Sequence, residues 1–249
     1  MAETVLLTGA TGLIGKVLAK NFLEHGYRVV VTSRSNEKLE ALCNEFDRKN
    51  VFGCEVDLVA DDAIDVIRNF LEANDLKPNY LVNNARSLEF LRTADFRRID
   101  KSQWLGEYAL DVIVPYNLTM LLSERPGNRL QSVVNVSSMY GVLAYNDYLC
   151  EGAKSISFQY GTAKAALIQL TRQLAVSLAP QHIRVNAISY GGVVGRADEA
   201  FQRRYAKLCP ERKMLSTDEI AGHVLYLCSE ASAGMTGHNL IVDGGFSAW

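Results

Sequence analysis

Tyr160 and Lys164, four positions apart, are the residues of this sequence best suited to proton transfer. A free phenol ionises at about pH 10, and a nearby ammonium group favours its charged form. Positions i and i+4 share one face of a helix, so both side chains can point into one cleft. This spacing alone is usually structural. Here it carries more weight, because Ser138 ends an apolar strand shortly before it.

A glycine-rich segment near the start of the chain could bind phosphate. Gly9, Gly12 and Gly15 lie where a first strand is expected to turn into a first helix. The bare backbone can approach a pyrophosphate there, and the helix N-terminus offers N–H donors and partial positive charge. We therefore predict a nucleotide-binding turn. A tight turn of purely structural origin is the alternative.

The residues after the second apolar strand bear on which dinucleotide would bind. At this place a carboxylate recognises a free ribose 2′-hydroxyl, and a cation accommodates a 2′-phosphate. The sequence reads Thr32-Ser33-Arg34-Ser35, without an acid. We therefore predict NADP(H) in preference to NAD(H), with a solvated Arg34 as the alternative. Asp57 falls where it could meet the adenine amino group or cap a helix near Asp61.

These motifs sit among alternating strand and helix signals. Runs that are apolar on both faces, separated by helical periodicity, predict a doubly wound, Rossmann-type α/β fold with helices on both faces of a seven-stranded parallel sheet. No linker interrupts the pattern, so we expect one NAD(P)-binding domain over residues 1–249. Residues 139–158 and 190–216 look irregular. The expected strands are 5–7, 28–32, 51–56, 80–82, 132–136, 183–188 and 239–242, and the expected helices are 14–22, 63–71, 104–122, 160–178 and 218–228.

The composition of the chain excludes several classes of function. With 249 residues and 48% apolar content, the chain can bury one large core. A net charge of −2 without long Lys or Arg runs argues against nucleic-acid binding. The five cysteines, none in a C-x-x-C pair, suggest reduced thiols and no metal site. No basic leader or long apolar run is seen, so we expect a cytoplasmic protein that does not bind membranes.

Taken together, the motifs make the chain resemble the short-chain dehydrogenase/reductase family in its compact form. The resemblance implies an oxidoreductase that moves a hydride between nicotinamide and a small-molecule carbonyl or secondary alcohol. It also implies a homo-oligomer, a dimer or tetramer. The matching motifs are Thr8-Gly9 to Gly15, Asp57-Leu58, Asn83-Asn84-Ala85, Asn135-Val-Ser-Ser138, Tyr160 to Lys164, residues 183–188 and residues 235–245.

The resemblance assigns roles to individual residues. It implies that Tyr160 exchanges the proton, that Lys164 favours the ionised phenol and holds the nicotinamide ribose, and that Ser138 binds the substrate oxygen, while Ser137 faces the sheet. The family's helix asparagine, which helps to hold a water beside the lysine, falls on Asp111. We expect an altered proton relay there, or else a helix acid paired with a neighbouring base. The implied cofactor contacts are Gly9, Thr11, Gly12, Leu13, Ile14, Ser33, Arg34, Asp57, Leu58, Asn84, Ala85, Tyr160, Lys164, Tyr190, Gly191 and Val193.

Several positions depart from the family pattern. Arg86 replaces a glycine, Tyr190 a proline and Gly195 a frequent threonine. They motivate one alternative, a catalytically weak NADP-binding sensor or scaffold. The glycine spacing motivates another, a sugar-nucleotide epimerase or dehydratase, although the substrate domain usual there has no room in this chain.

Residues 143–158 form an insert before the tyrosine. We expect it to shape the pocket for a sugar or other hydroxyl-rich ligand, with a plain surface loop as the alternative. The insert and the C-terminal segment are similar to dehydrogenases of flagellin modification and surface-sugar synthesis. The polar and aromatic residues of the insert are Tyr145, Asn146, Asp147, Tyr148, Glu151 and Lys154.

Overall fold

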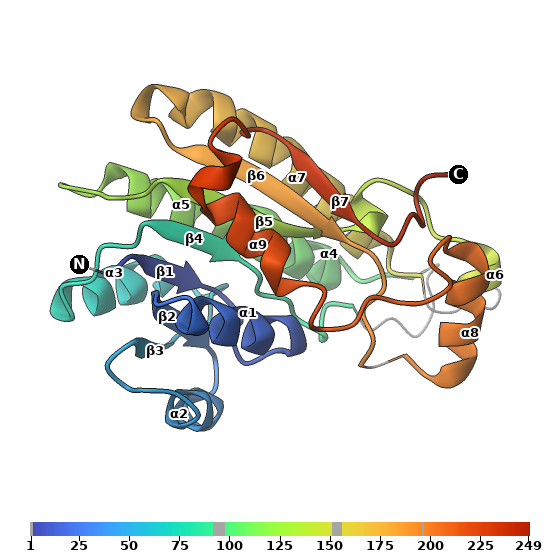
Figure 1. The fold of residues 1–249 in the computed structure, drawn as a ribbon, viewed down its shortest axis with the longest axis horizontal. Coiled ribbons are helices and arrows are strands. Elements are labelled where there is room, and N and C mark those ends of the chain that lie inside the picture. Colours follow the sequence, from blue (N-terminus) through green and yellow to red (C-terminus); the bar gives the residue numbers. More distant parts are fainter. Residues whose placement is uncertain (1, 92–97, 151–155, 196) are drawn as a thin grey trace.

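Seven parallel strands form one sheet in the order β3-β2-β1-β4-β5-β6-β7 (Figure 1). The computed structural model describes residues 2–91, 98–150, 156–195 and 197–249. The predicted Rossmann-type fold is confirmed, and each predicted strand is present to within two residues at either end. The strands are β1 (Thr4–Leu7), β2 (Arg28–Ser33), β3 (Val51–Glu55), β4 (Tyr80–Asn83), β5 (Ser132–Ser138), β6 (Arg184–Tyr190) and β7 (Asn239–Val242).

Helices cover both faces of the sheet (Figure 1). Side chains of α1, α2 and α9 pack into one apolar cluster with the strands, and those of α3, α5 and α7 pack into another. Helix α4 lies on the same side as α5 and α7. The bounds are α1 (Leu13–Glu24), α2 (Asn36–Asn44), α3 (Ala63–Ala73), α4 (Lys101–Tyr108), α5 (Val114–Glu124), α7 (Phe158–Leu178) and α9 (Ala221–Cys228).

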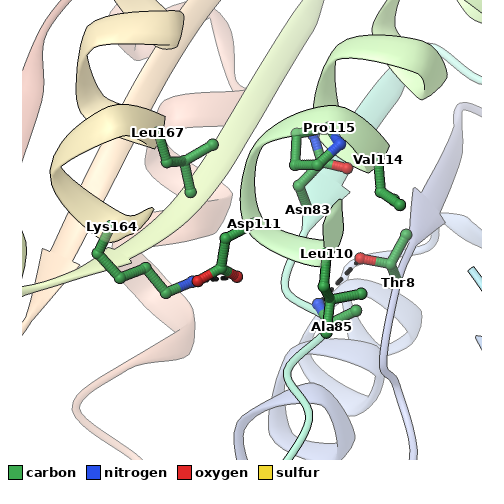
Figure 2. Close-up of a pocket in the computed structure, with 9 residues that line it drawn as sticks. All are labelled: Thr8, Asn83, Ala85, Leu110, Asp111, Val114, Pro115, Lys164 and Leu167. Atoms are coloured by element: carbon green, nitrogen blue, oxygen red, sulfur yellow. Dashed lines mark hydrogen bonds and ion pairs between the residues drawn. The ribbon is translucent and has the colours of Figure 1, made fainter. Parts of the chain in front are cut away.

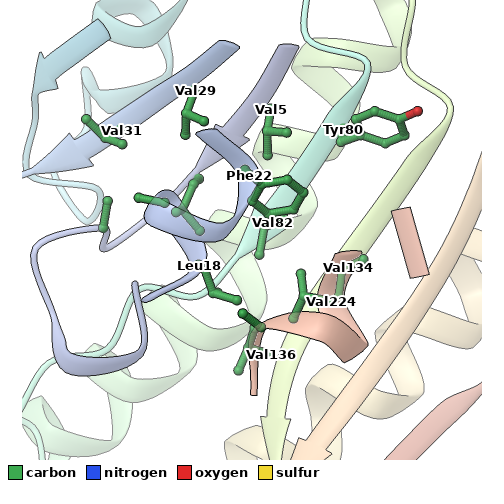
Figure 3. Close-up of a cluster of buried hydrophobic side chains, with 14 of the residues drawn as sticks. Val5, Leu18, Phe22, Val29, Val31, Tyr80, Val82, Val134, Val136 and Val224 are labelled. Carbon is green, nitrogen blue, oxygen red and sulfur yellow. The ribbon is translucent and has the colours of Figure 1, made fainter. Parts of the chain in front are cut away.

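Neighbouring residues of one strand point to opposite faces of the sheet and belong to the two different apolar clusters. Val5 and Leu7 of β1 pack with Phe22 of α1, as Figure 3 shows for Val5 and Phe22, whereas Leu6 packs with Leu118 of α5. All of these side chains are at most 1% exposed. Because both faces of the sheet are covered, the strands are continuously apolar and do not alternate with polar residues.

Three helices were not predicted. Helix α2 buries few side chains, which weakens its apolar periodicity, although Ser35 caps it by accepting a hydrogen bond from the Lys38 N–H. Within 190–216, predicted to be irregular, α8 spans Glu199–Leu208 and fully buries only Tyr205. Within 139–158, the short α6 spans Asp147–Cys150. Tyr205 packs with Leu149 and Phe246 in a small cluster that supports this region.

The helix predicted over 104–122 is interrupted. A π-helical turn, η1 (Ala109–Ile113), separates α4 from α5. Pro115 lacks an N–H and cannot donate to the Asp111 carbonyl four residues earlier, which removes one bond of regular α geometry. Such turns occur often at functional sites, and this one contains Asp111. In the described part of the chain, no helix is long and apolar enough to cross a membrane.

Candidate active site

A cleft of about 1020 Å³ opens along the carboxyl ends of the strands. This is the edge at which doubly wound sheets bind ligands. All the residues predicted to contact a cofactor line the cleft, and Ser138 lines it with them. Asp111 differs, because it lies in a smaller neighbouring cavity that Lys164 also borders (Figure 2).

The three glycines of the first turn have different physical roles. Gly9 has a φ of +65°, and a side chain there would place its Cβ 2.6 Å from the Ala85 Cα atom. A Cβ on Gly15 would lie 2.2 Å from the Gly9 carbonyl oxygen. Gly12 has no such obstacle, since the nearest atom to a Cβ would be 3.4 Å away.

The N-terminus of α1 is open toward the cleft. Gly12 is its N-cap, and no side chain accepts a hydrogen bond from the first turn. The first backbone N–H groups of a helix lack intrahelical partners. The turn thus offers bare donors and a partial positive charge beside Gly12, as an anionic phosphate requires.

The loop after β4 is fastened to the glycine turn. The Thr8 hydroxyl accepts hydrogen bonds from the backbone N–H groups of Asn84 and Ala85, at 2.9 and 3.0 Å. In return, the Asn84 side chain donates to the carbonyls of Thr8 and Gly9. Both loops are therefore held at the point where the chain order reverses between β1 and β4.

The end of β2 presents hydroxyl groups and one cation to the cleft. The Thr11 and Ser33 hydroxyls lie 3.1 Å apart. Arg34 is exposed, and its nearest acid is Glu89, whose carboxylate is 3.9 Å away and also exposed. The ion-pair partner that the described residues offer to Arg34 is therefore held only loosely.

The alternative helix-capping role of Asp57 is not what the structure shows. Its carboxylate accepts from the Val59 N–H at 3.3 Å, which forms a local turn. The N-cap of α3 is instead Asp62, whose side chain makes no capping bond. Asp57 is exposed and lines the cleft.

The two serines that end β5 are used differently. Ser137 donates from its hydroxyl to the Lys164 carbonyl at 3.1 Å, which ties β5 to α7. The Ser138 hydroxyl accepts from the Tyr140 N–H at 3.2 Å and lines the cleft. A hydroxyl accepting one bond still has its own proton to donate, so Ser138 retains a donor.

Tyr160 lines the cleft, and two cations lie close to its ring. Its side chain is 8% exposed. The Arg86 guanidinium is 4.7 Å from the centre of its ring, and the Lys164 ammonium is 5.7 Å from the same point. Both cations lie within the range of cation–π attraction.

Lys164 forms a buried ion pair with Asp111. Its Nζ atom donates to Asp111 Oδ1 at 2.9 Å and to the Val136 carbonyl at 3.0 Å (Figure 2 shows the ion pair). Lys164 is 4% and Asp111 2% exposed, and every other described lysine is exposed. Asp111 thus contacts the lysine directly, as a helix acid paired with a base.

Glu107 is a buried acid that sequence analysis missed. It lies four residues before Asp111 and is 1% exposed. Neither of its carboxyl oxygens has a hydrogen-bond partner, and Asp111 Oδ2 also has none. Burial and then the charge of Asp111 raise the pKa of Glu107 to about 7, although Lys164 and Arg86 oppose the rise. Its position on the core face of the predicted helix was the available signal.

Tyr190, another departure from the family pattern, is anchored away from the cleft by its hydroxyl. The hydroxyl donates to the Ile220 carbonyl at 2.7 Å, and burial raises its pKa. The following Gly191 fits tightly, since a Cβ there would lie 2.6 Å from the Tyr205 hydroxyl oxygen. Both residues border the cleft.

The insert reaches the cleft indirectly. None of its described residues lines the cleft. Tyr145 stacks on Tyr140, which does line it, with ring centres 4.0 Å apart. Leu149 is fully buried in the cluster beneath α8. Glu151 and Lys154 lie outside the described residues.

The described residues form neither a metal-binding cluster nor a disulfide bond. No group of three or more His, Cys, Asp or Glu side chains there could hold a metal ion. Cys43, Cys54, Cys209 and Cys228 are buried and unpaired, and burial raises the pKa of the Cys54 thiol to about 11.

Three comparisons relate this geometry to known proteins. The family model described as enoyl-(acyl carrier protein) reductase matches residues 9–247. The 3-oxoacyl-(acyl-carrier-protein) reductase FabG of Aquifex aeolicus is 29% identical, over 96% of this chain and 95% of that protein. The probable galactose dehydrogenase GalD of Rhizobium meliloti is 30% identical, over 97% and 93%. A short chain dehydrogenase from Leptospira borgpetersenii with bound NAD+ is 26% identical, with a TM-score of 0.86 over 99% of this chain and 93% of that one.

We expect Lys164→Met to lower the free energy of unfolding by about 3 kcal/mol above neutral pH, because it leaves the buried charge of Asp111 without its partner. Urea denaturation measures the change. Lys20→Met is the matched control, since its pair with Glu24 is exposed, and it should cost less than about 1 kcal/mol. Equal losses in both variants would contradict this interpretation.

Proposed function

This chain belongs to the short-chain dehydrogenase/reductase family, and we propose that Ser138, Tyr160 and Lys164 carry its chemistry with NADP(H) as the preferred cofactor. The family membership makes the protein an NAD(P)-dependent oxidoreductase that acts on an alcohol or a carbonyl group. The observation that supports the proposal best is the convergence of Tyr160, a buried ammonium and the Ser138 hydroxyl at one end of the cleft.

The residues of the first turn would hold the cofactor's pyrophosphate. Gly12 leaves room for it, and the open N-terminus of α1 supplies backbone donors. Lys164 would hold the nicotinamide ribose at the other end of the cleft, with Tyr190, Gly191 and Val193 lining the wall beside it. The bound nicotinamide supplies the hydride acceptor or donor.

Tyr160 would move the proton. In alcohol oxidation its phenolate takes the hydroxyl proton of the substrate as the carbon gives up a hydride, and in reduction the phenol returns that proton to the oxygen. The Ser138 hydroxyl can donate to the same oxygen and fix its position. Lys164, which forms an ion pair with Asp111, would stabilise the phenolate by its proximity.

Tyr160→Phe should reduce kcat by at least about 100-fold, because it removes the group that transfers the proton. The affinity for NADPH should change less than about threefold, since the ring and Lys164 remain. Steady-state assays with a panel of ketones, keto sugars and alcohols, together with fluorescence titration of NADPH, measure both.

The control for this variant is Tyr116→Phe, which removes an exposed phenol on α5. It should leave turnover unchanged. Normal turnover in Tyr160→Phe would refute the catalytic role of Tyr160 while leaving family membership intact.

The preference for NADP(H) rests on the end of β2. Ser33 stands where a carboxylate would select NAD(H), and Arg34 lines the cleft with only a loose ion pair to Glu89. A 2′-phosphate carries more charge than the exposed Glu89 carboxylate and can compete for the guanidinium.

Arg34→Gln should therefore weaken NADPH binding by about tenfold, the loss of one charge-assisted hydrogen bond, with little effect on NADH. Calorimetric titration with both nucleotides measures the ratio of affinities. Arg68→Gln, an exposed arginine on α3, is the control and should change neither. Equal weakening of NADPH and NADH in Arg34→Gln would contradict the assignment.

We also propose a sugar or another hydroxyl-rich compound as the substrate. Beside Ser138 and Tyr160 the cleft is lined by Arg86 and Tyr140, which can hydrogen-bond several hydroxyl or anionic groups. The relative GalD, a probable galactose dehydrogenase, is consistent with this class. A link to flagellin modification stays a prediction.

A homo-oligomer would cover apolar side chains on the face formed by α4, α5 and α7. Val176 of α7 is 78% exposed and Leu105 of α4 is 59% exposed. Contiguous exposed apolar groups mark interaction sites. The same face also exposes Ile113, Tyr116 and Phe158.

Val176→Asp should raise the dissociation constant of the oligomer at least about tenfold, because a charge would be buried in the interface. Sedimentation over a range of concentrations measures it. Ala41→Asp on the exposed side of α2, on the opposite face of the sheet, should have no effect. A wild-type protein that sediments as a monomer throughout would remove the proposal.

A further inference from the structure

Glu107 has an environment that an ionised carboxylate does not tolerate. Both of its oxygens are buried without a hydrogen-bond donor. Burying a charge without a partner costs several kcal/mol, and the group commonly takes up a proton instead. The charge of Asp111, four residues further along the chain, also raises the pKa of Glu107. A hydrogen bond between the two groups would need a proton, because two carboxylates are both acceptors.

We propose that Glu107 and Asp111 share one proton, which lies on Glu107 and bonds to Asp111 Oδ2, so that Asp111 Oδ1 is left to hold Lys164. The proposal satisfies two of the orphaned groups at once. Glu107 becomes a donor and Asp111 Oδ2 gains a partner, while Oδ1 keeps its 2.9 Å bond to Lys164 Nζ. Glu107 is thus a positioning residue that acts through Asp111.

The neighbouring cavity does not offer Glu107 another partner. It is about 10 Å³ in volume, close to the size of one water molecule. Asp111, Asn83 and Lys164 line it, and Glu107 does not. A water there could reach Asp111 Oδ2 but would leave both Glu107 oxygens without a donor.

The charges of the cluster balance when one proton is shared. Lys164 then faces a single negative charge, which lies on Asp111. The other charged group acting on Glu107 in the described part of the chain is Arg86, which lies over the Tyr160 ring. If the proton leaves, the cluster gains a second negative charge close to Lys164 and Tyr160. The charge state of Glu107 is therefore coupled to the site.

The shared proton should be lost from Glu107 near neutral pH. Because the pKa of Glu107 is raised to about 7, the shared proton is held below that pH and lost above it. A glutamate in water ionises at about pH 4.3. The folded state alone keeps the proton between these two values, so stability due to this group is present at the acid end of the window and declines as pH rises through it.

Infrared difference spectroscopy of the whole protein, titrated from acid to alkaline pH, tests the proposal. The measurement does not require the protein to turn over a substrate. We expect the carbonyl band of a buried carboxylic acid, lost with a midpoint near neutrality and absent from Glu107→Gln. Asp111→Asn should move the midpoint to lower pH, because the neighbouring charge has gone. Glu24→Gln, an exposed control on α1, should keep the band.

The proposal is overturned if Glu107→Gln and wild type give the same spectra at every pH, or if the Glu107 band disappears in the ordinary glutamate range. Should Glu107→Gln not fold, the comparison of wild type with Asp111→Asn decides alone, and an unchanged midpoint would count against a shared proton.

A second measurement rests on the proposed function. If Tyr160 transfers the proton, removing the titrating charge in Glu107→Gln should move the acid limb of the alcohol-oxidation pH profile to lower pH by about half a unit or more. Glu107→Gln keeps an amide donor for Asp111, so a purely structural role would leave the limb in place. An infrared band without a moved limb would retain the shared proton and refute only its coupling to catalysis.

Discussion

The buried ion pair between Lys164 and Asp111 is the constraint on which the rest of the site depends. A charged ammonium that is 4% exposed must have close partners, and it finds them in Asp111 Oδ1 and the Val136 carbonyl. Lys164 lies on α7, and its two partners come from η1 and β5. Their mutual position is therefore fixed by the need to neutralise one charge, and Tyr160, one helical turn before Lys164, is fixed with them.

The sheet positions the other end of the cleft, where the cofactor would bind. Because all seven strands are parallel, their carboxyl ends meet at one edge of the sheet. The cleft opens along this edge, where the strand order reverses between β1 and β4. Gly9 and Gly15 permit close packing of the first turn, whereas Gly12 leaves space that nothing in the chain fills. The cofactor end thus depends on backbone geometry, and the proton-transfer end depends on the paired charges.

Sequence patterns predicted the features that depend on residues close together in the chain. The seven strands follow from continuous apolar runs, and Gly12, Ser138 and Tyr160 line one cleft. Helix α8 was missed because only Tyr205 on it is fully buried. Asp111, which contacts Lys164 directly, lies in the π-helical turn before Pro115, and apolar periodicity does not predict such a turn. Glu107 was missed because an acid at a core position is intelligible only once its neighbour is known to be another acid beside a lysine.

The most direct test of the buried ion pair is nitrogen-15 NMR of lysine side chains in the wild-type protein. We expect one ammonium signal whose protons exchange slowly with water at neutral pH. This signal should be absent from Lys164→Arg, which assigns it, and lost or shifted in Asp111→Asn. All described lysines apart from Lys164 are exposed and should exchange fast. A spectrum in which no lysine ammonium is protected from exchange would contradict the buried pair, and the organisation of the site derived from it would not stand.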